Sequence, residues 1–254
     1  MSIDIVTIPC RTDNYAYLVR SGNRTALVDV PEAQPILDAL DARGWALDEV
    51  WITHHHDDHV AGMPQIRARF PDIHVTGGAK DAERLPPLDR AMSDGERFSF
   101  DGHTVHVLDV SGHTVGHIAF HMPDADAAFT ADSLMALGCG RVFEGTPEMM
   151  WQSLVRLRDL PDETMVYSGH EYTRTNARFA LTIEPGNDAL QDRAARIDAA
   201  RERGEPTVPS KLSEERATNP FIRAHLSEVK QAISMEGAED SAVFAEIRAR
   251  KDDF

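Results

Sequence analysis

Residues 48–59 read Asp-Glu-Val-Trp-Ile-Thr-His-His-His-Asp-Asp-His, a short apolar run followed by a dense group of histidines and aspartates. The β-branched and aromatic residues of 48–53 predict a short buried strand. The residues from Val60 to Phe70 are compatible with a helix, in which Ile66 and Phe70 lie one turn apart. The cluster therefore follows a strand end, where α/β proteins often place a site because the strand fixes the side chains and the loop faces solvent.

The spacing inside this cluster suits more than one metal ion. Zinc and iron accept imidazole nitrogen and carboxylate oxygen, and catalytic sites keep one coordination position open for water. In an extended segment His54 and His56 point to the same side, so they can share one ion. Asp58 and His59 lie where the chain turns into the helix, so they can hold a second ion beside the first.

The other two residues of the cluster, His55 and Asp57, point away on the same alternation and receive no ligand role. A solvated histidine-rich loop is the alternative reading of this stretch. The run is internal, contains acids and follows a strand pattern, which argues against a purification tag. The choice between a loop and a metal site therefore depends on further ligands elsewhere in the chain.

Composition limits the partners that the chain can bind. The 254 residues suit one large domain, or a domain with a smaller appendage, and 42% of them are hydrophobic, enough for a packed core. Lys plus Arg number 26 against 42 Asp plus Glu, which gives a formal charge of -16. Nucleic-acid binding needs a basic face and is not expected. An anionic small molecule remains possible if local Arg or Lys residues reverse the field at its pocket.

The sequence also indicates the compartment. No apolar run is long enough to span a bilayer, and the first residues lack the pattern of a secretory signal. Cys10 and Cys139 are far apart and outside any C-x-x-C pattern, so two reduced thiols are expected. We expect a cytoplasmic protein without membrane contact, either a monomer or a weak homo-oligomer.

Strand and helix patterns divide the chain into two parts. Expected strands cover residues 4–8, 15–19, 25–30, 48–53, 73–76, 97–100, 104–110, 118–122, 127–130 and 164–168. Expected helices cover residues 35–40, 60–70 and 149–160, and beyond Tyr172, where strand signals disappear, residues 178–183, 188–203, 227–236 and 241–251. This order predicts two mixed sheets packed together and covered by helices, followed by a helical region.

Three further polar residues come just after expected strands. His113 lies in Ser-Gly-His-Thr-Val-Gly-His at 111–117, Asp132 lies in Phe-Thr-Ala-Asp-Ser at 129–133, and His170 lies in Tyr-Ser-Gly-His-Glu-Tyr at 167–172. Neighbouring small residues let the backbone approach a crowded centre. Each residue alone can be an ordinary polar residue at a strand end. Together with the cluster they supply the roughly seven ligands of a two-metal site.

These strings resemble the metallo-β-lactamase superfamily, and within it the glyoxalase II family, the hydroxyacylglutathione hydrolases. The resemblance rests on T-H-x-H-x-D-H at 53–59, on S-G-H-T-x-G-H at 111–117, and on the segments of Asp132 and His170. It implies an α/β fold, an αββα sandwich over residues 1–171 with a binuclear metal centre in a groove at one edge. It also implies an all-helical substrate-binding domain over residues 172–254.

The resemblance implies a ligand for each coordination position. One ion takes three histidines, the other takes an aspartate and two histidines, and a further aspartate bridges the ions: His54, His56 and His113; Asp58, His59 and His170; and Asp132. Three of these residues also have catalytic roles. Asp58 orients the attacking hydroxide, His59 helps to hold the ion that stabilises the oxyanion, and Asp132 keeps the two ions together. Two divalent ions are expected, zinc first, with iron or manganese as alternatives.

The helical part points to glutathione. Ser-Gly-His-Glu-Tyr-Thr at 168–173, Asn-Pro-Phe-Ile-Arg at 219–223 and Arg-Ala-Arg-Lys-Asp at 248–252 resemble the same family. The resemblance implies six substrate contacts, in which two basic residues grip the glycine carboxylate: Arg248 and Lys251, with Tyr172, Asn176, Arg141 and Phe143. Phe143 replaces a tyrosine of some relatives, so a hydroxyl contact is missing. The alternative for the two basic residues is a solvated last helical turn.

The implied reaction is hydrolysis of S-D-lactoylglutathione to glutathione and D-lactate by a metal-bridging hydroxide, a step of methylglyoxal detoxification. The glutathione thiolate leaves readily, because its thiol pKa is near the value of about 8.5 for free cysteine. Alternatives of the same fold are a persulfide dioxygenase, a lactonase or another thioesterase. A non-catalytic metal-binding protein is the alternative from another class.

Overall fold

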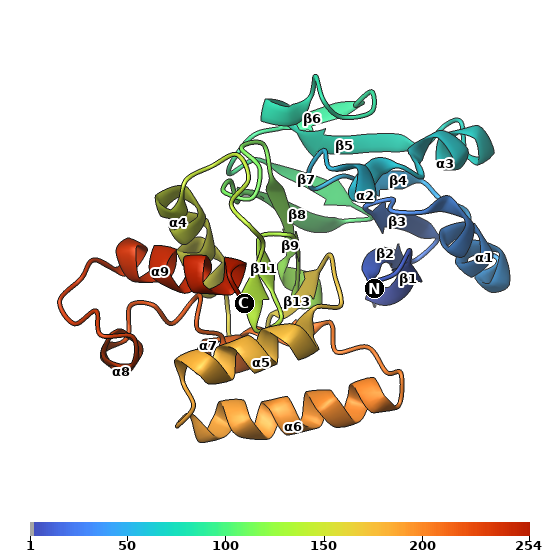
Figure 1. Ribbon diagram of the computed structural model, residues 1–254. Coiled ribbons are helices and arrows are strands. Elements are labelled where there is room, and N and C mark those ends of the chain that lie inside the picture. Colours follow the sequence, from blue (N-terminus) through green and yellow to red (C-terminus); the bar gives the residue numbers. More distant parts are fainter. Residues whose placement is uncertain (1–2) are drawn as a thin grey trace. The chain divides into compact units, whose positions relative to one another are not determined.

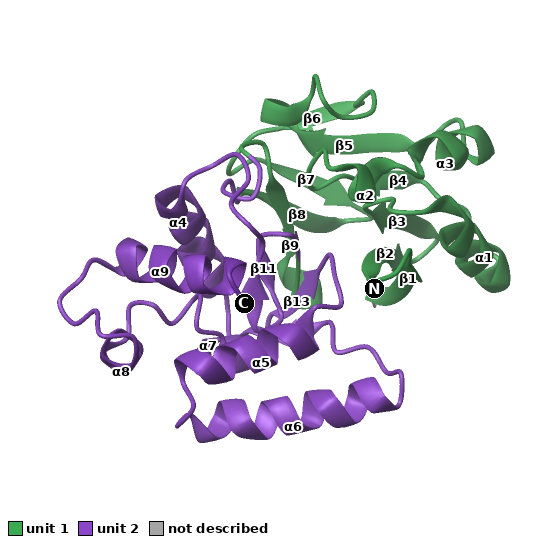
Figure 2. Ribbon diagram, in the orientation of Figure 1, with its two compact units in different colours: residues 1–109, 115–129 green, residues 110–114, 130–254 purple. Residues whose placement is uncertain are grey.

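A computed structural model describes residues 3–254, which form two compact units (Figure 2). Unit 1 contains the described residues up to 109 together with 115–129, and unit 2 contains residues 110–114 and 130–254. The domain boundary expected after residue 171 stays a prediction, because compact units and independently folding domains are different properties.

The first sheet of unit 1 has six strands in chain order. These are β1 (Ile3–Cys10), β2 (Asn14–Ser21), β3 (Arg24–Val28), β4 (Glu49–Trp51), β5 (His74–Gly78) and β6 (Arg90–Met92). Strands β1 to β3 pair antiparallel, and β3 to β6 pair parallel. The parallel part places the carboxyl ends of β3 and β4 next to each other, so the loops that follow them emerge at one edge.

An antiparallel meander forms the second layer of unit 1. It consists of β7 (Arg97–Phe100), β8 (His103–Asp109), β9 (Ile118–Met122) and the first part of β10 (Ala127–Ala131), which runs on into unit 2. Alternation along β8 places Val105 and Val107 inside, each 0% exposed, while Thr104 is exposed. Alternate residues of β8 therefore face the core of unit 1.

Trp51 joins the two layers of unit 1. Its ring centroid lies 5.3 Å from those of Phe98 and Phe100 and 5.6 Å from that of Phe120, with the first two pairs in edge-to-face geometry. The indole Nε1–H donates to Glu49 Oε2 at 3.0 Å, so the one polar atom of this buried ring is satisfied. Ring contacts and one hydrogen bond therefore hold the last residue of the strand that precedes the histidine cluster.

Helices cover the outer face of the first sheet (Figure 1). They are α1 (Ala33–Arg43), the single turn α2 (Asp57–Val60) and α3 (Met63–Arg69). Short 3₁₀ turns follow β5 at Ala79–Asp81 and β9 at Pro123–Ala125. Ile36, Leu40 and Ile66 are fully buried in the core between these helices and the sheet. Helix α1 ends at Gly44, whose φ of 63° allows its N–H to bond back to the last turn.

Unit 2 is mainly helical. Its elements are β11 (Leu134–Met135), β12 (Gly138–Cys139), α4 (Pro147–Arg158), β13 (Met165–Ser168), α5 (Thr173–Ile183), α6 (Asp188–Glu202), β14 (Ser210–Lys211), α7 (Leu212–Thr218), α8 (Ser227–Ala232) and α9 (Asp240–Asp252). Helices α5 and α6 lie side by side as an antiparallel pair (Figure 1). Leu137, Ala180 and Leu190 belong to the apolar cluster that fills this pair.

The expectation that no strand follows Tyr172 was wrong. Strand β14 pairs antiparallel with β13 and aligns Ser210 with Val166. Two residues are too few to show alternation, so the pattern could not reveal this strand. Helix α5 also begins at residue 173 rather than 178, and α8 ends at 232 rather than 236. Within residues 3–254, no helix combines the length and apolarity needed to cross a bilayer.

Candidate metal centre

Unit 1 brings four of the expected ligands together where β4 gives way to α2. His54 lies in the middle, and its ring centroid is 4.8 Å from that of His56 and 4.1 Å from that of His59. Asp58 Oδ2 is 3.8 Å from His59 Nε2. His54 and His59 are fully buried. The short turn of α2 is what brings residues 58 and 59 back beside residues 54 and 56.

Asp29 sets the orientation of two of these histidines. Its carboxylate accepts from Thr53 N at 2.9 Å, from Thr53 Oγ1 at 2.8 Å and from His59 Nδ1 at 2.7 Å. Because the Thr53 hydroxyl donates to Asp29, it accepts from His54 Nδ1 at 3.1 Å. Both histidines thus carry their proton on Nδ1, which leaves Nε2 as the nitrogen for a metal.

Asp29 was not predicted from the sequence. It follows β3 at a φ of 56°, a conformation that aspartate tolerates better than most residues. Its one sequence signal is a lone acid in an apolar run, between Val28 and Val30. That signal alone does not identify its partners, which lie 24 and 30 positions away.

Two more residues outside the predicted set contact the unit 1 ligands. Asn14 Nδ2 donates to Asp58 Oδ2 at 3.0 Å and to the Asp58 carbonyl at 3.1 Å, so it fixes both the side chain and the backbone of this ligand. His117 stacks on His54, with ring centroids 4.6 Å apart and planes 13° from parallel. His117 is the last residue of the S-G-H-T-x-G-H string, which was the signal available in the sequence.

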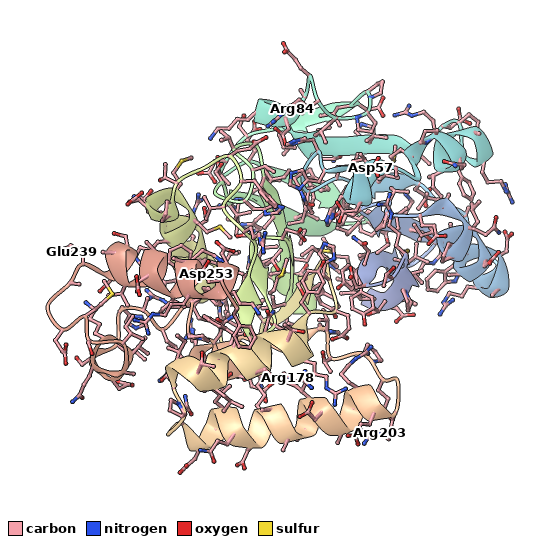
Figure 3. The ribbon with its side chains drawn as sticks, in the orientation of Figure 1. Asp57, Arg84, Arg178, Arg203, Glu239 and Asp253 are labelled. Carbon is pink, nitrogen blue, oxygen red and sulfur yellow. The ribbon has the colours of Figure 1, made fainter. Side chains whose placement is uncertain are left out.

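The two residues of the cluster without an assigned ligand role have other partners. His55 Nδ1 lies 3.0 Å from Asp81 Oδ2. Asp57, at the start of α2 (Figure 3), pairs with Arg11 at 2.9 Å, and its side chain is 83% exposed. The Asp57 carboxylate is therefore surrounded by solvent and one surface ion pair. The Asp29 carboxylate, by contrast, is buried.

Unit 2 brings the other three expected ligands together around one carboxylate oxygen. Asp132 Oδ2 lies 3.4 Å from His113 Nε2 and 3.3 Å from His170 Nε2. All three residues are buried, with exposures of 3 to 6%. The segment 110–114, the end of β10 and the end of β13 supply them, as expected for polar residues that follow strands.

The surroundings of this second set fix its protonation and packing. His113 Nδ1 donates to the Arg141 carbonyl at 2.8 Å, so Nε2 is again the ligand nitrogen. A Cβ on Gly140 would lie 2.0 Å from the Asp132 carbonyl oxygen and 3.0 Å from His113 Nδ1. Only glycine allows this close approach. Tyr172 stacks on His170 with ring centroids 4.7 Å apart.

Both sets fit divalent metal ions. Each offers imidazole nitrogens beside carboxylate oxygens, the donor set that zinc, iron and manganese share. In His54, His59 and His113 the bond at Nδ1 leaves Nε2 for a metal. Hydrogen bonds to Asp29 and to the Arg141 carbonyl orient these rings, and such bonds are typical of metal-binding histidines.

The predicted substrate contacts also lie in unit 2, and three of them form a cationic group. Asp252 Oδ1 is 3.3 Å from Arg141 Nε and 3.0 Å from Arg248 Nη2. Burial first, and then the charges of Arg248 and Arg141, lower the pKa of Lys251 to about 8, while Asp252 acts in the opposite direction. Arg141, Arg248 and Lys251 therefore lie close together, with one carboxylate among them.

The remaining predicted contacts differ in exposure. Tyr172 is 40% exposed and Phe143 is 63% exposed, with the Phe143 ring centroid 5.2 Å from that of His113. Asn176 is only 6% exposed and donates to the Ala136 carbonyl at 3.0 Å. Tyr172 and Phe143 are thus available to a ligand beside His170 and His113, whereas the Asn176 amide is directed into the protein. The substrate roles of all six residues stay predictions.

Family models match the whole chain except its first ten residues. The model described as metallo-beta-lactamase superfamily matches residues 11–170, and the model described as hydroxyacylglutathione hydrolase C-terminus matches residues 171–254. A curated hydroxyacylglutathione hydrolase from Ruegeria pomeroyi is 60% identical over 256 residues, with 100% of each chain covered.

Solved structures agree with the fold. The BLEG-1 B3 metallo-beta-lactamase aligns with a TM-score of 0.66 at 18% identity, over 86% of this chain and 99% of its own. TTHA1623, described in a di-iron-bound form, aligns with a TM-score of 0.56 at 27% identity, over 65% of this chain and 90% of its own. The expected αββα metallo-β-lactamase sandwich with a C-terminal helical region is confirmed. The chain belongs to the hydroxyacylglutathione hydrolase family of the metallo-β-lactamase superfamily.

Proposed function

We propose that the chain hydrolyses S-D-lactoylglutathione to glutathione and D-lactate with two divalent metal ions. Zinc is the metal we expect, with iron or manganese as alternatives. The observation that best supports this proposal is the position of the Asp132 carboxylate. One of its oxygens lies 3.4 Å from His113 Nε2 and 3.3 Å from His170 Nε2. A carboxylate so placed suits a bridging ligand. The proposal joins this set to the four ligands of unit 1, as the family pattern of seven residues implies.

Two ions rather than one are supported by the donors present and by a relative. Together the two sets offer five imidazoles and two carboxylates, more than a single ion accommodates. The relative TTHA1623 is described in a di-iron-bound form. When bound, such ions supply Lewis acidity and lower the pKa of a bound water to about 7.

Three groups of the chain hold the metal ligands in place for this reaction. Asp29 and the Arg141 carbonyl hold the histidine tautomers, and Asn14 holds Asp58 by two hydrogen bonds of 3.0 and 3.1 Å. This pre-orientation removes reorganisation from the reaction step. A side-chain general acid is unnecessary, because the thiol of the leaving group has a pKa of about 8.5.

The cationic group of unit 2 supports an anionic substrate. A chain with a formal charge of -16 repels the carboxylates of glutathione at long range. Arg141, Arg248 and Lys251 reverse the sign locally, and Asp252 cancels only one of the three charges. Lys251 and Arg141 are the better placed to meet a ligand, because Arg248 is only 6% exposed.

The cellular setting belongs to the same proposal. We expect the enzyme to act in the cytoplasm on a small-molecule glutathione thioester, as a monomer or weak homo-oligomer, without nucleic acid or membrane as a partner. A metallo-β-lactamase-like domain at 1–171 and a helical substrate-binding domain at 172–254 remain the proposed division of labour.

The test is a comparison of substrates with the purified, metal-loaded protein. Thiol release from S-D-lactoylglutathione is expected at a kcat/KM far above that for a lactone or a thioester without glutathione. Oxygen uptake with glutathione persulfide should not exceed the buffer control. Thiol release at background level, together with oxygen uptake or lactone opening, would replace the proposal with the dioxygenase or the lactonase. Absence of all turnover would leave a metal-binding protein.

A further inference from the structure

The β11–β12 hairpin lies between Asp132 and Arg141, whose carbonyl accepts from His113. Asp132 lies two residues before its first strand, and Gly140 and Arg141 follow its second strand directly. Gly140 N donates to the Ser133 carbonyl at 3.2 Å, so the base of the hairpin is closed next to Asp132. The position of the hairpin therefore fixes both the Asp132 carboxylate and the Arg141 carbonyl that accepts from His113.

Asn219, the first residue of the Asn-Pro-Phe-Ile-Arg string, holds this hairpin from the helical region. Its Nδ2 donates to the Met135 carbonyl at 3.2 Å and to the Gly138 carbonyl at 3.1 Å, one on each strand of the hairpin. Its Oδ1 accepts from Phe221 N at 3.0 Å. The side chain is fully buried, so both ends of the amide serve these contacts.

Three more side chains of the helical region bond to the same hairpin. Glu215 Oε2 accepts from Leu137 N at 2.9 Å and from Asn219 Nδ2 at 3.0 Å. Asn176 Nδ2 donates to the Ala136 carbonyl, and Arg248 Nη1 donates to the Cys139 carbonyl, both at 3.0 Å. Four of the five backbone carbonyls of residues 135–139, and the N–H of Leu137, thus have a side-chain partner from α5, α7, α9 or Asn219.

These bonds are more than the two-residue turn of the hairpin, Ala136 and Leu137, needs in order to form. Two non-glycine residues at positive φ, Ala131 at 41° and Leu137 at 54°, lie just before Asp132 and in the hairpin turn. Strained backbone of this kind persists only where its surroundings determine it several times over, and it gathers at functional sites. The Leu137 side chain is fully buried in the α5–α6 cluster, which adds a further hold on the turn.

We propose that Asn219 is a positioning residue for the metal ligands of unit 2. Through the hairpin it sets the place of Asp132 and of the carbonyl that orients His113, while it touches neither ligand itself. This inference rests on the proposed function, because it assigns Asp132 and His113 to a metal. A purely structural role would lower stability alone. A positioning role lowers metal affinity as well.

The experiment compares Asn219→Ala with Thr218→Val. Thr218 is the matched control, because it is 1% exposed, adjacent in sequence and bonded to Arg193 in the same helical region, yet it has no bond to the hairpin. Zinc affinity is measured on folded protein by competition with a chromogenic chelator, next to Tm, kcat and KM. For Asn219→Ala we expect affinity for one zinc to fall about 10- to 100-fold, the range for residues that orient ligands, with KM within about twofold.

Thr218→Val is expected to lower Tm comparably and to keep the zinc affinity and kcat of the unmodified protein. If Asn219→Ala does not fold, Asn219→Ser, which keeps one donor, should show a smaller loss of the same kind. Equal zinc affinity in both variants and the unmodified protein would overturn the positioning role and leave the proposed function intact. An unmodified protein that binds no zinc would overturn both.

Discussion

Asp132 is the residue on which the two-metal account depends most. Its replacement by alanine removes the carboxylate that lies 3.3 and 3.4 Å from two histidine nitrogens. We expect Asp132→Ala to bind fewer than two ions per chain and to lose more than about 100-fold in kcat, beyond the effect of losing an orienting residue. Elemental analysis and thiol release measure the two quantities. Two ions per chain with full activity would show that Asp132 does not bridge.

Asp29 should matter nearly as much, although it is no ligand. Asp29→Ala removes the acceptor of both Thr53 and His59, so the buried Nδ1–H of His59 loses its partner. A loss of about 10- to 100-fold in metal affinity is expected, together with about 1–3 kcal/mol of stability. Competition with a chelator measures the metal affinity, and urea unfolding measures the stability.

Asp57→Ala is the control for this prediction. Asp57 lies in the histidine cluster, but its side chain is 83% exposed and pairs with Arg11. Metal affinity within about twofold of the unmodified protein is expected, because a surface ion pair contributes about 0–1 kcal/mol. Loss of a metal ion in this variant would contradict the assignment of Asp57 as a non-ligand.

The sequence identified the candidate metal ligands better than it identified the residues that orient them. His113, Asp132 and His170 stand out because polar residues follow apolar strands among small neighbours. Asp29 and Asn14 give no comparable signal, since each acts on a residue at least 24 positions away. Such a pairing exists only once the strands have aligned.

At the level of elements, the last turn of α9 carries Lys251, whose charge depends on its surroundings. Burial, then Arg248 and Arg141, lower the pKa of Lys251 to about 8. Lys251 is cationic below that pH and neutral above it, so its attraction for a substrate carboxylate fades as the pH rises through about 8. We expect KM to rise over that interval, and Lys251→Ala to raise KM about 10-fold, or about 1.4 kcal/mol, with a smaller change in kcat.

Lys251→Arg separates this effect from other titrations. A guanidinium stays charged throughout the range, so the KM of this variant should change little between pH 7 and about 9. A KM that rises equally in both proteins would assign the titration to another group. An unchanged KM in Lys251→Ala would remove Lys251 from the substrate site.

Elements were predictable in proportion to their length. The strands β1, β2 and β8 and the helices α4 and α6 show a full period of apolar residues, and the structure contains them close to the expected bounds. The two-residue strands β11, β12 and β14 show none. They form because partners elsewhere hold them, as Asn219 holds the β11–β12 hairpin.

At the scale of the whole molecule, the packing of the two layers of unit 1 supports the strand that delivers the cluster. Trp51→Ala would leave a cavity among Phe98, Phe100 and Phe120. A loss of about 3–5 kcal/mol in the free energy of unfolding is expected. Trp45→Ala, at a half-buried ring next to Arg20 and Arg43, should cost less. Equal losses in urea unfolding would contradict this account of the core.

A metal titration of chelator-treated protein shows how many ions the active enzyme needs. Zinc is added in steps, and the rate of thiol release from S-D-lactoylglutathione is recorded against equivalents bound per chain. We expect the activity of the unmodified protein to reach its plateau at two equivalents and that of Asp132→Ala never to reach it. A plateau at one equivalent, or full activity without metal, would contradict the binuclear centre.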